Sequence, residues 1–177
     1  MTDMNSTPDL FRDITTFIFD IDGVMTDGRV IVLENGLQAR SMSTKDGFAL
    51  QLAVKKGYRL LVLSGAAPSP VVDRLNKLGV TDIHMNVKDK RSMVQHYMTT
   101  HALGAAEVLY MGDDMPDLAP MSIVGLPASP SDAVMEIKGI SKYISAFGGG
   151  AGCVRDVIEK VLKLNGHWDN NTDIPSR

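Results

Sequence analysis

The chain has 177 residues, of which 44% are hydrophobic, 22% charged and only 6% aromatic, a composition that suits a single globular domain. The formal net charge of −3 and the lack of a long basic run argue against nucleic acid as a partner. The start is polar and acidic, and no stretch approaches ~20 apolar residues, so we expect a cytoplasmic protein without membrane contact.

The first predicted element is a short apolar run at residues 15–20, which is typical of a strand buried on both faces. Asp20 ends this run, and Asp22 and Gly23 follow, so two carboxylates lie on the same side before a sharp turn. Carboxylates this close repel each other unless a cation or a shared proton separates them, as between a metal-bound nucleophile and a proton donor. The alternative is a turn whose acids only cap backbone amides, and the Thr-Asp-Gly at residues 26–28 weakens it.

The second predicted element interrupts the helix–strand alternation. Residues 29–33 and 37–43 are joined across residues 34–36, where Asn-Gly is a turn signal for a β-hairpin. We expect this hairpin to project from the domain.

A helix and a second strand come next. Asp46 is a candidate cap for a helix that Gly57 would end. The apolar run at residues 59–64 then leads into Ser64-Gly65, where a hydroxyl and free backbone amides could hold a phosphoryl oxygen. This signal is weak by itself, because many strand-to-helix turns contain Ser and Gly.

Two further helices are predicted, one opened by Pro68 and ended by Gly79, the other over residues 89–101. Lys90, at the start of the second, could neutralise a phosphate as a point charge. A solvated lysine is the commoner case, and Lys88 competes for the role.

The apolar run at residues 107–112 precedes a group of acids, with Asp113 and Asp114 directly after it and Asp117 one helical turn later. Carboxylate oxygens at a strand end suit Mg²⁺, which binds one or two protein carboxylates and keeps several waters. Asp114 could instead cap a helix that opens at Met115, with Asp117 supporting that cap. Asp113 is therefore the first candidate for the metal role, while Asp114 and Asp117 could either support the metal site or cap the helix.

The last predicted elements are a strand at residues 122–126 and an amphipathic helix that Gly166 closes. The apolar stripe of this helix consists of Val154, Val157, Ile158, Val161 and Leu162. The polar ends, before about residue 10 and after residue 168, are expected to be mobile, so that one domain has its core at about residues 10–166.

This order of elements predicts an α/β fold, a doubly wound parallel sheet with helices on both faces and a site at the carboxyl ends of its strands. Four strand ends would bring a carboxylate pair, a hydroxyl, an ammonium and a metal-binding carboxylate to one edge. These groups can neutralise and position a transferring phosphoryl group.

In this order, the segments FIFDIDGVMTDG, LLVLSG, Lys90 and YMGDDMPD resemble the four motifs of the haloacid dehalogenase superfamily, over about residues 15–164. More narrowly, the TDG sequence, the hairpin with its NG turn, KDGFAL at residues 45–50 and GGAGCVRD at residues 149–156 resemble the 3-deoxy-D-manno-octulosonate 8-phosphate phosphatases. The resemblance implies a Rossmann-like core without a cap domain and a role in lipopolysaccharide biosynthesis. It also implies a homotetramer in which each active site is covered by a neighbouring subunit.

The resemblance also implies roles for individual residues. Asp20 would attack phosphorus, Asp22 would protonate the leaving oxygen and later activate water, and Ser64, Gly65 and Lys90 would bind the phosphate. Mg²⁺ would be held by the Asp20 side chain, the Asp22 carbonyl and Asp113.

The departures from the family pattern concern the substrate. Ala66 stands where the family usually has Arg, Ala151 where it commonly has Arg or Lys, and Lys45 where it has Arg. Fewer guanidinium groups mean fewer bidentate anchors for a sugar carboxylate, so a nine-carbon sialic-type sugar acid phosphate is an alternative substrate. Lys45 is a candidate to bind the substrate carboxylate. Arg155 is a second candidate, although it could equally stabilise the preceding glycine-rich loop by pairing with an acid.

The main non-enzymatic alternative is a receiver-like signalling domain, which also gathers acids, a phosphoacceptor Asp, a hydroxyl and a lysine on a parallel sheet. Receivers carry the acceptor Asp on a middle strand, where this chain has Ser64-Gly65, so the order favours a hydrolase. An inactive assembly partner is disfavoured because every catalytic position is filled.

Overall fold

The computed structural model describes residues 7–168 and 174, and most of the polar tails expected to be mobile lie outside these residues. Six parallel strands form the central sheet, in the order β5-β4-β1-β6-β7-β8. The strands of the sheet are β1 (Thr16–Phe19), β4 (Arg59–Leu63), β5 (Asp82–His84), β6 (Val108–Met111), β7 (Leu126–Ser129) and β8 (Tyr143–Ile144).

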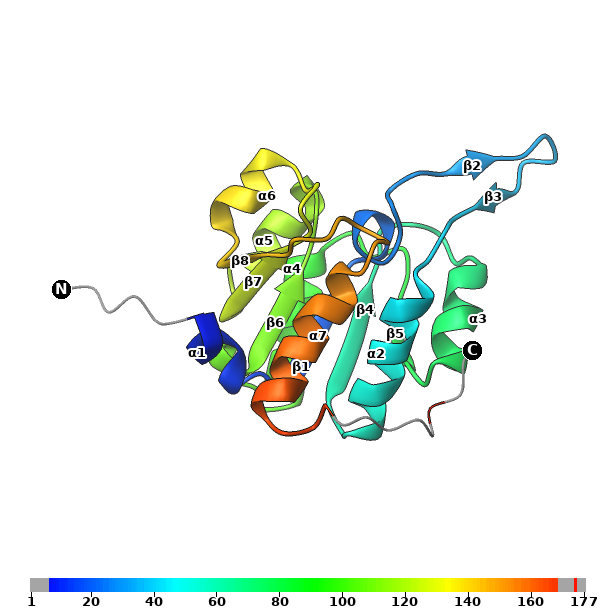
Figure 1. Cartoon of the computed structure of the whole chain (residues 1–177). Coiled ribbons are helices and arrows are strands. Elements are labelled where there is room, and N and C mark those ends of the chain that lie inside the picture. The colour runs from blue at the N-terminus through cyan, green and yellow to red at the C-terminus, as the bar shows by residue number, and fades with distance from the viewer. Residues whose placement is uncertain (1–6, 169–173, 175–177) are drawn as a thin grey trace.

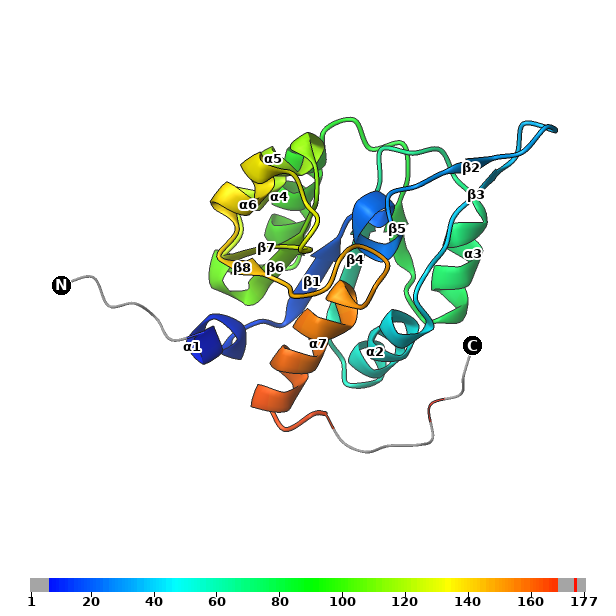
Figure 2. The same ribbon diagram turned by 45° about the horizontal axis from the view of Figure 1, so that its top comes forward.

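Helices cover both faces of this sheet (Figures 1 and 2). α2 and α7 lie side by side on one face, where α1 and α3 join the same apolar cluster, whereas α4, α5 and α6 cover the other face. The helices are α1 (Thr7–Arg12), α2 (Thr44–Lys55), α3 (Pro70–Lys77), α4 (Lys90–Thr100), α5 (Leu118–Met121), α6 (Met135–Ile140) and α7 (Cys153–Leu164). Short helical turns occur at Ile21–Met25, Ala105–Glu107 and Met115–Asp117. The predicted doubly wound α/β fold is confirmed.

The core explains why residues 17–19 of β1 are all apolar. Phe17 and Phe19 of β1 join the cluster under α2 and α7, and Ile18, between them, joins the cluster under α4. Successive residues of a strand point to opposite faces, so a strand covered on both sides needs apolar residues at every position.

Two predicted helix starts were wrong. Ser43, not Asp46, caps α2, because the Ser43 hydroxyl accepts a hydrogen bond from the Asp46 N–H. Asp46 instead lies buried in the first turn of α2. α3 begins at Pro70 rather than Pro68, since Pro70 takes the first helical position after Ser69.

The predicted C-terminal ends of α2 and α3 are confirmed. Gly57 and Gly79 follow α2 and α3 with φ of +83° and +88°, a conformation that suits glycine at a helix end. α4 matches its prediction, with Asp89 as its cap, and the whole predicted stripe of α7 is buried.

The strand predicted at residues 122–126 begins only at Leu126, because residues 122–125 form the turn that leads into β7. The sequence prediction also missed α1, α6 and the strands β5 and β8. β5 has only three half-buried residues and β8 has two, so neither has a pattern long enough to read.

The predicted hairpin projects from the domain, as Figures 1 and 2 show. Its paired strands are short, β2 (Ile31–Val32) and β3 (Gln38–Ala39), and an isolated bridge between Thr26 and Met42 closes its base. No helix in the described part of the chain is both long and apolar enough to span a membrane.

Candidate active site

A cavity of about 480 Å³ lies at the carboxyl ends of β1, β4 and β6, the edge that the sequence predicted. It brings together all the predicted site residues except Lys45 and Arg155. The predicted residues in its lining are Asp20, Asp22, Ser64, Gly65, Lys90, Asp113, Asp114 and Asp117.

Lys90 is the buried cation of this site. Its Nζ donates hydrogen bonds to Asp20 Oδ1 and to Asp117 Oδ1, both at 2.7 Å, and only 6% of its side chain is exposed. Lys90 is the first residue of α4, where the side chain of Asp89 caps the helix. Lys88 lines the cavity from an exposed position, so the buried role belongs to Lys90.

The carboxylates that face the cavity are poorly compensated. Burial and the charge of Asp117 raise the pKa of Asp20 to about 6, although Lys90 opposes the shift. Burial, followed by the charges of Asp20 and Asp117, raises the pKa of Asp113 to about 7. One lysine therefore does not balance the acids. Burial alone would lower the pKa of Lys90, but Asp20 and Asp117 outweigh it and raise that pKa.

Asp117 is hydrogen-bonded to three other residues of the site. Besides Lys90, it accepts hydrogen bonds from the Tyr110 hydroxyl at 2.7 Å and from the Asp113 N–H at 3.1 Å. Asp114 is exposed and caps the turn Met115–Asp117 by accepting a hydrogen bond from the Met115 N–H. The structural role considered for Asp114 is confirmed, and Asp117 positions both Lys90 and the Asp113 backbone.

A group of carboxylates could hold a metal ion. Asp20, Asp113 and Asp117 each offer an oxygen within 4.8 Å of the others. Gly23 makes room for this group, because a Cβ atom there would lie 1.9 Å from Asp113 Oδ2, and its φ of +90° also favours glycine. Asp22 lines the same cavity but is turned to Arg40, whose Nε lies 2.6 Å from Asp22 Oδ1.

The loop that carries Asp20 and Asp22 is supported from the far end of the chain. Within the loop, Thr26 Oγ1 accepts hydrogen bonds from the N–H groups of Gly23 and Gly28. Gly150 donates a hydrogen bond to Val24 O at 2.9 Å. The glycine run at residues 148–150 therefore supports the site loop.

The Ser64 hydroxyl is set up to donate. Its Oγ accepts a hydrogen bond from the Ala66 N–H at 3.1 Å, which leaves the hydroxyl hydrogen for another acceptor in the cavity. This geometry suits the predicted contact with a phosphate oxygen.

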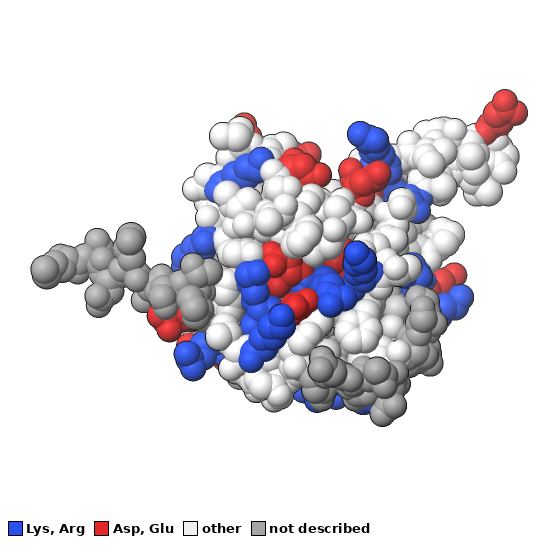
Figure 3. Space-filling view, in the orientation of Figure 1, with Lys and Arg blue, Asp and Glu red and all other residues white. Residues whose placement is uncertain are grey.

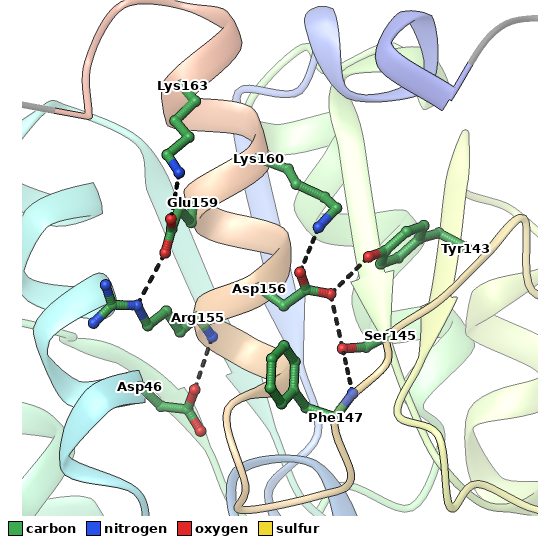
Figure 4. A network of polar contacts seen from close by, with 9 residues as sticks. All are labelled: Asp46, Tyr143, Ser145, Phe147, Arg155, Asp156, Glu159, Lys160 and Lys163. Atoms are coloured by element: carbon green, nitrogen blue, oxygen red, sulfur yellow. Dashed lines mark hydrogen bonds and ion pairs between the residues drawn. The ribbon is translucent and has the colours of Figure 1, made fainter.

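Lys45 and Arg155 line a different cavity, beside α2 and α7. Figure 4 shows Arg155 turned along α7 toward Glu159, with Nε 3.0 Å from Glu159 Oε2, while its backbone N–H donates to Asp46. The guanidinium also lies over the rings of Phe48 and Trp168. On this face basic side chains surround acidic ones (Figure 3), and neither Lys45 nor Arg155 reaches the acids of its own chain's site.

The sequence analysis did not predict two residues of the site, Tyr110 and Arg40. Tyr110 lies within the apolar run of β6, where nothing distinguishes it from a core residue. Arg40 belongs to the hairpin, and only the folded chain brings it to Asp22. No local signal could have revealed either contact.

The chain is similar to known proteins in sequence and in structure. No family model matches it. A structure from Legionella pneumophila assigned to the HAD superfamily (subfamily III A) hydrolases is 31% identical, with a TM-score of 0.88 over 92% of this chain and 90% of that one. The 3-deoxy-D-manno-octulosonate 8-phosphate phosphatase of Escherichia coli K12 is 28% identical over 158 residues, 89% of this chain and 84% of the relative. The Moraxella catarrhalis phosphatase of the same name, in complex with magnesium ion, phosphate ion and KDO, is 28% identical, with a TM-score of 0.86 over 91% and 92% of the two chains.

A doubly wound parallel sheet with clustered acids and a buried lysine at its carboxyl edge defines the class, a Rossmann-like α/β protein with an acidic site. The chain belongs to the haloacid dehalogenase (HAD) superfamily of hydrolases.

Proposed function

We propose that the protein is a magnesium-dependent phosphatase that hydrolyses 3-deoxy-D-manno-octulosonate 8-phosphate. The observation that carries this proposal is the convergence of Asp20, Asp113 and Lys90 in one cavity with the Ser64 hydroxyl. The relatives in Escherichia coli and Moraxella catarrhalis supply the substrate class.

The donor set fits Mg²⁺. Asp20 and Asp113 offer carboxylate oxygens, the ligands that Mg²⁺ prefers, and burial together with the neighbouring acids raises the pKa of both carboxyl groups. Asp20 and Asp113 would hold the ion, with Asp117 as support. Bound Mg²⁺ would neutralise charge on the phosphate and on the attacking carboxylate.

The residues then divide the reaction. An Asp20 oxygen attacks phosphorus as the ester bond breaks, and Asp22 gives its proton to the leaving oxygen. Lys90 and the Ser64 hydroxyl stabilise charge on the phosphoryl oxygens. In the second half, Asp22 takes a proton from the water that attacks the aspartyl phosphate, which frees Asp20 and inorganic phosphate.

The site is open on one side, and we propose that a homotetramer covers it. The hairpin offers five exposed apolar residues, which suit an interface. Their exposed fractions are 40% for Val30, 62% for Ile31, 70% for Val32, 43% for Leu33 and 62% for Leu37. Because Lys45 and Arg155 lie away from their own chain's acids, any part they take in binding the sugar acid would be in a neighbouring subunit's site. The cytoplasmic location expected from the sequence stays a prediction.

The first test is the variant Asp20→Asn, together with removal of divalent metal. The amide keeps the shape of the side chain but is a very poor nucleophile, so turnover should fall below roughly a thousandth of the wild-type rate. Chelation should stop phosphate release and Mg²⁺ should restore it. Asp114→Asn, a change of the same kind at the exposed cap, should retain much of the activity.

The substrate is tested with a panel of phosphate esters at fixed Mg²⁺. It contains the eight-carbon sugar acid phosphate, a nine-carbon sialic-type sugar acid phosphate and a sugar phosphate without a carboxylate. The highest kcat/KM is expected for the eight-carbon acid, and equal values for all three would contradict the assigned substrate class.

A further inference from the structure

Arg40 makes a contact with the acid that the proposed reaction uses for proton transfer. Its Nε donates a hydrogen bond to Asp22 Oδ1 at 2.6 Å, a short contact between opposite charges. Asp22 is one-third exposed and lines the cavity, whereas only 10% of the Arg40 side chain is exposed. A guanidinium so deeply buried needs a charged partner, and Asp22 is that partner.

The contact crosses the base of the hairpin. Asp22 precedes the hairpin, Arg40 follows β3, and the bridge between Thr26 and Met42 lies beside them. Any movement of the hairpin relative to the sheet therefore moves Arg40 relative to Asp22.

The other acids of the site have different anchors. Lys90 holds Asp20 and Asp117, and Asp117 accepts a hydrogen bond from the Asp113 backbone. Asp22 is outside the carboxylate group that could bind a metal. Among the described side chains, Arg40 is the one with a hydrogen bond to Asp22.

We propose that Arg40 is a positioning residue that orients Asp22 for proton transfer and so connects the seating of the hairpin to the chemistry of the site. This inference rests on the proposed phosphatase reaction. Arg40 occupies Oδ1, so the proton given to the leaving oxygen is carried by Oδ2. When that proton leaves, Asp22 becomes a carboxylate, and the adjacent guanidinium stabilises it.

The test compares two kinds of leaving group. Arg40→Met keeps a long side chain but removes the hydrogen bond and the charge. An alkyl phosphate needs its leaving oxygen protonated, whereas 4-nitrophenyl phosphate has a leaving group that departs with little help. We expect kcat/KM to fall by roughly ten- to 150-fold for the sugar acid phosphate and by less than about threefold for the aryl ester. We compare kcat/KM because it depends only on the steps up to and including loss of the leaving group.

A double-mutant cycle with Asp22→Asn shows whether Arg40 acts through Asp22. In the Asp22→Asn background, Arg40→Met should cause no further loss of kcat/KM. With Asp22 intact, Arg40→Lys keeps the positive charge and should retain more activity than Arg40→Met. Arg29→Met, the same substitution at an exposed position of the other hairpin arm, is the matched control and should leave both substrates unaffected. If Arg40→Met does not fold, Arg40→Gln replaces it in every comparison.

Equal losses on both substrates, or a further loss in the Asp22→Asn background, would overturn the positioning role. A wrong proposed function would give a different result, because the wild-type protein itself would then show no preference for the sugar acid phosphate. The comparison of leaving groups can then be made with any alkyl phosphate that the wild type hydrolyses.

Discussion

The carboxylate of Asp46 joins two helices that lie far apart in the sequence. Asp46 is in the first turn of α2, and it accepts a hydrogen bond at 2.8 Å from the N–H of Arg155, 109 residues later, in the first turn of α7 (Figure 4). Burial raises the pKa of Asp46 to about 6, against the opposing effect of that hydrogen bond. At neutral pH the chain therefore carries a buried ionised carboxylate at a cost in stability.

The variant Asp46→Asn should change how stability depends on pH. A raised carboxyl pKa means that the native state gains stability from this group as pH falls through about 6, and the gain is complete below the unfolded value of 3.8. The difference corresponds to about 3 kcal/mol. Asp46→Asn should remove this contribution, so its free energy of unfolding in urea should rise less than that of the wild type between pH 7 and pH 4.

Glu34→Gln, at the exposed hairpin turn, is the control and should follow the wild-type profile. An Asp46→Asn profile parallel to the wild type would show that Asp46 titrates in the same way in the folded and unfolded chains.

Asp113 and Asp20 should make Mg²⁺ binding dependent on pH. Their pKa values of about 7 and 6 in the metal-free protein mean that Mg²⁺ competes with protons below neutrality. The Kd should weaken by roughly tenfold or more from pH 8 to pH 6. Calorimetric titration in two buffers of different ionisation enthalpy should detect proton release on binding at pH 6.5. The same Kd at both pH values, without proton release, would contradict the raised pKa values.

Among the elements, the loop after β1 depends most on close packing. A Cβ atom at Gly149 would lie 2.1 Å from the Gly23 carbonyl oxygen, and the contact is between two backbones that cannot rotate apart. The loop that holds Asp20 and Asp22 is therefore supported by residues 149–150, which only glycine allows to approach so closely.

Gly149→Ala should push this support away from the loop. We expect a loss of roughly 1–3 kcal/mol in the free energy of unfolding and a lower kcat, because the loop carries both Asp20 and Asp22. Gly139→Ala is the control, since a Cβ atom there would meet nothing within 4 Å and Gly139 lies inside α6. It should stabilise the protein by about 0.5–1 kcal/mol without changing kcat. Equal effects of the two substitutions would refute the supporting role of Gly149.

The elements that could be predicted from the sequence are those whose hydrophobic pattern lies within one continuous segment of the chain. The apolar run of β1 and the stripe of α7 follow from burial on both faces or on one face, and the order of the strands then places Asp20, Ser64 and Asp113 at one edge. β8 could not be predicted, because two residues become a strand only by pairing with β7. The role of Asp46 was also hidden, since its partner lies in another helix.

At the scale of the whole molecule, the hairpin is the feature that a lone subunit cannot explain. Its surface is mostly uncharged in Figure 3, and it carries the five exposed apolar side chains away from the domain. An apolar arm of this kind has a use if a second copy covers it. The Asn-Gly turn and the projection of the hairpin could be predicted from the sequence, but a partner surface could not, because contacts between subunits leave no periodic pattern in one chain.

Val32→Glu combined with Leu37→Glu should break the proposed tetramer. Two charges at positions that are 70% and 62% exposed in one subunit should leave its fold intact while making burial in an interface costly. Light scattering should show a smaller particle, and activity on the sugar acid phosphate should fall. Met135→Glu, at a 76% exposed position on α6, is the control. An unchanged mass for the double variant would exclude the hairpin as the interface.

The support that the glycines at residues 149–150 give to the loop after β1 has a consequence for protein synthesis. The ribosome makes Asp20 early, but the residues that pack against its loop, Gly149 and Gly150, are made much later. β1 also waits for both of its neighbours, β4 and β6, before it is paired on each side. A nascent chain that ends before Gly150 has the acids of the site without the support for their loop. We therefore expect the acids of the site to reach their folded arrangement only after residues 149–150 have left the ribosome.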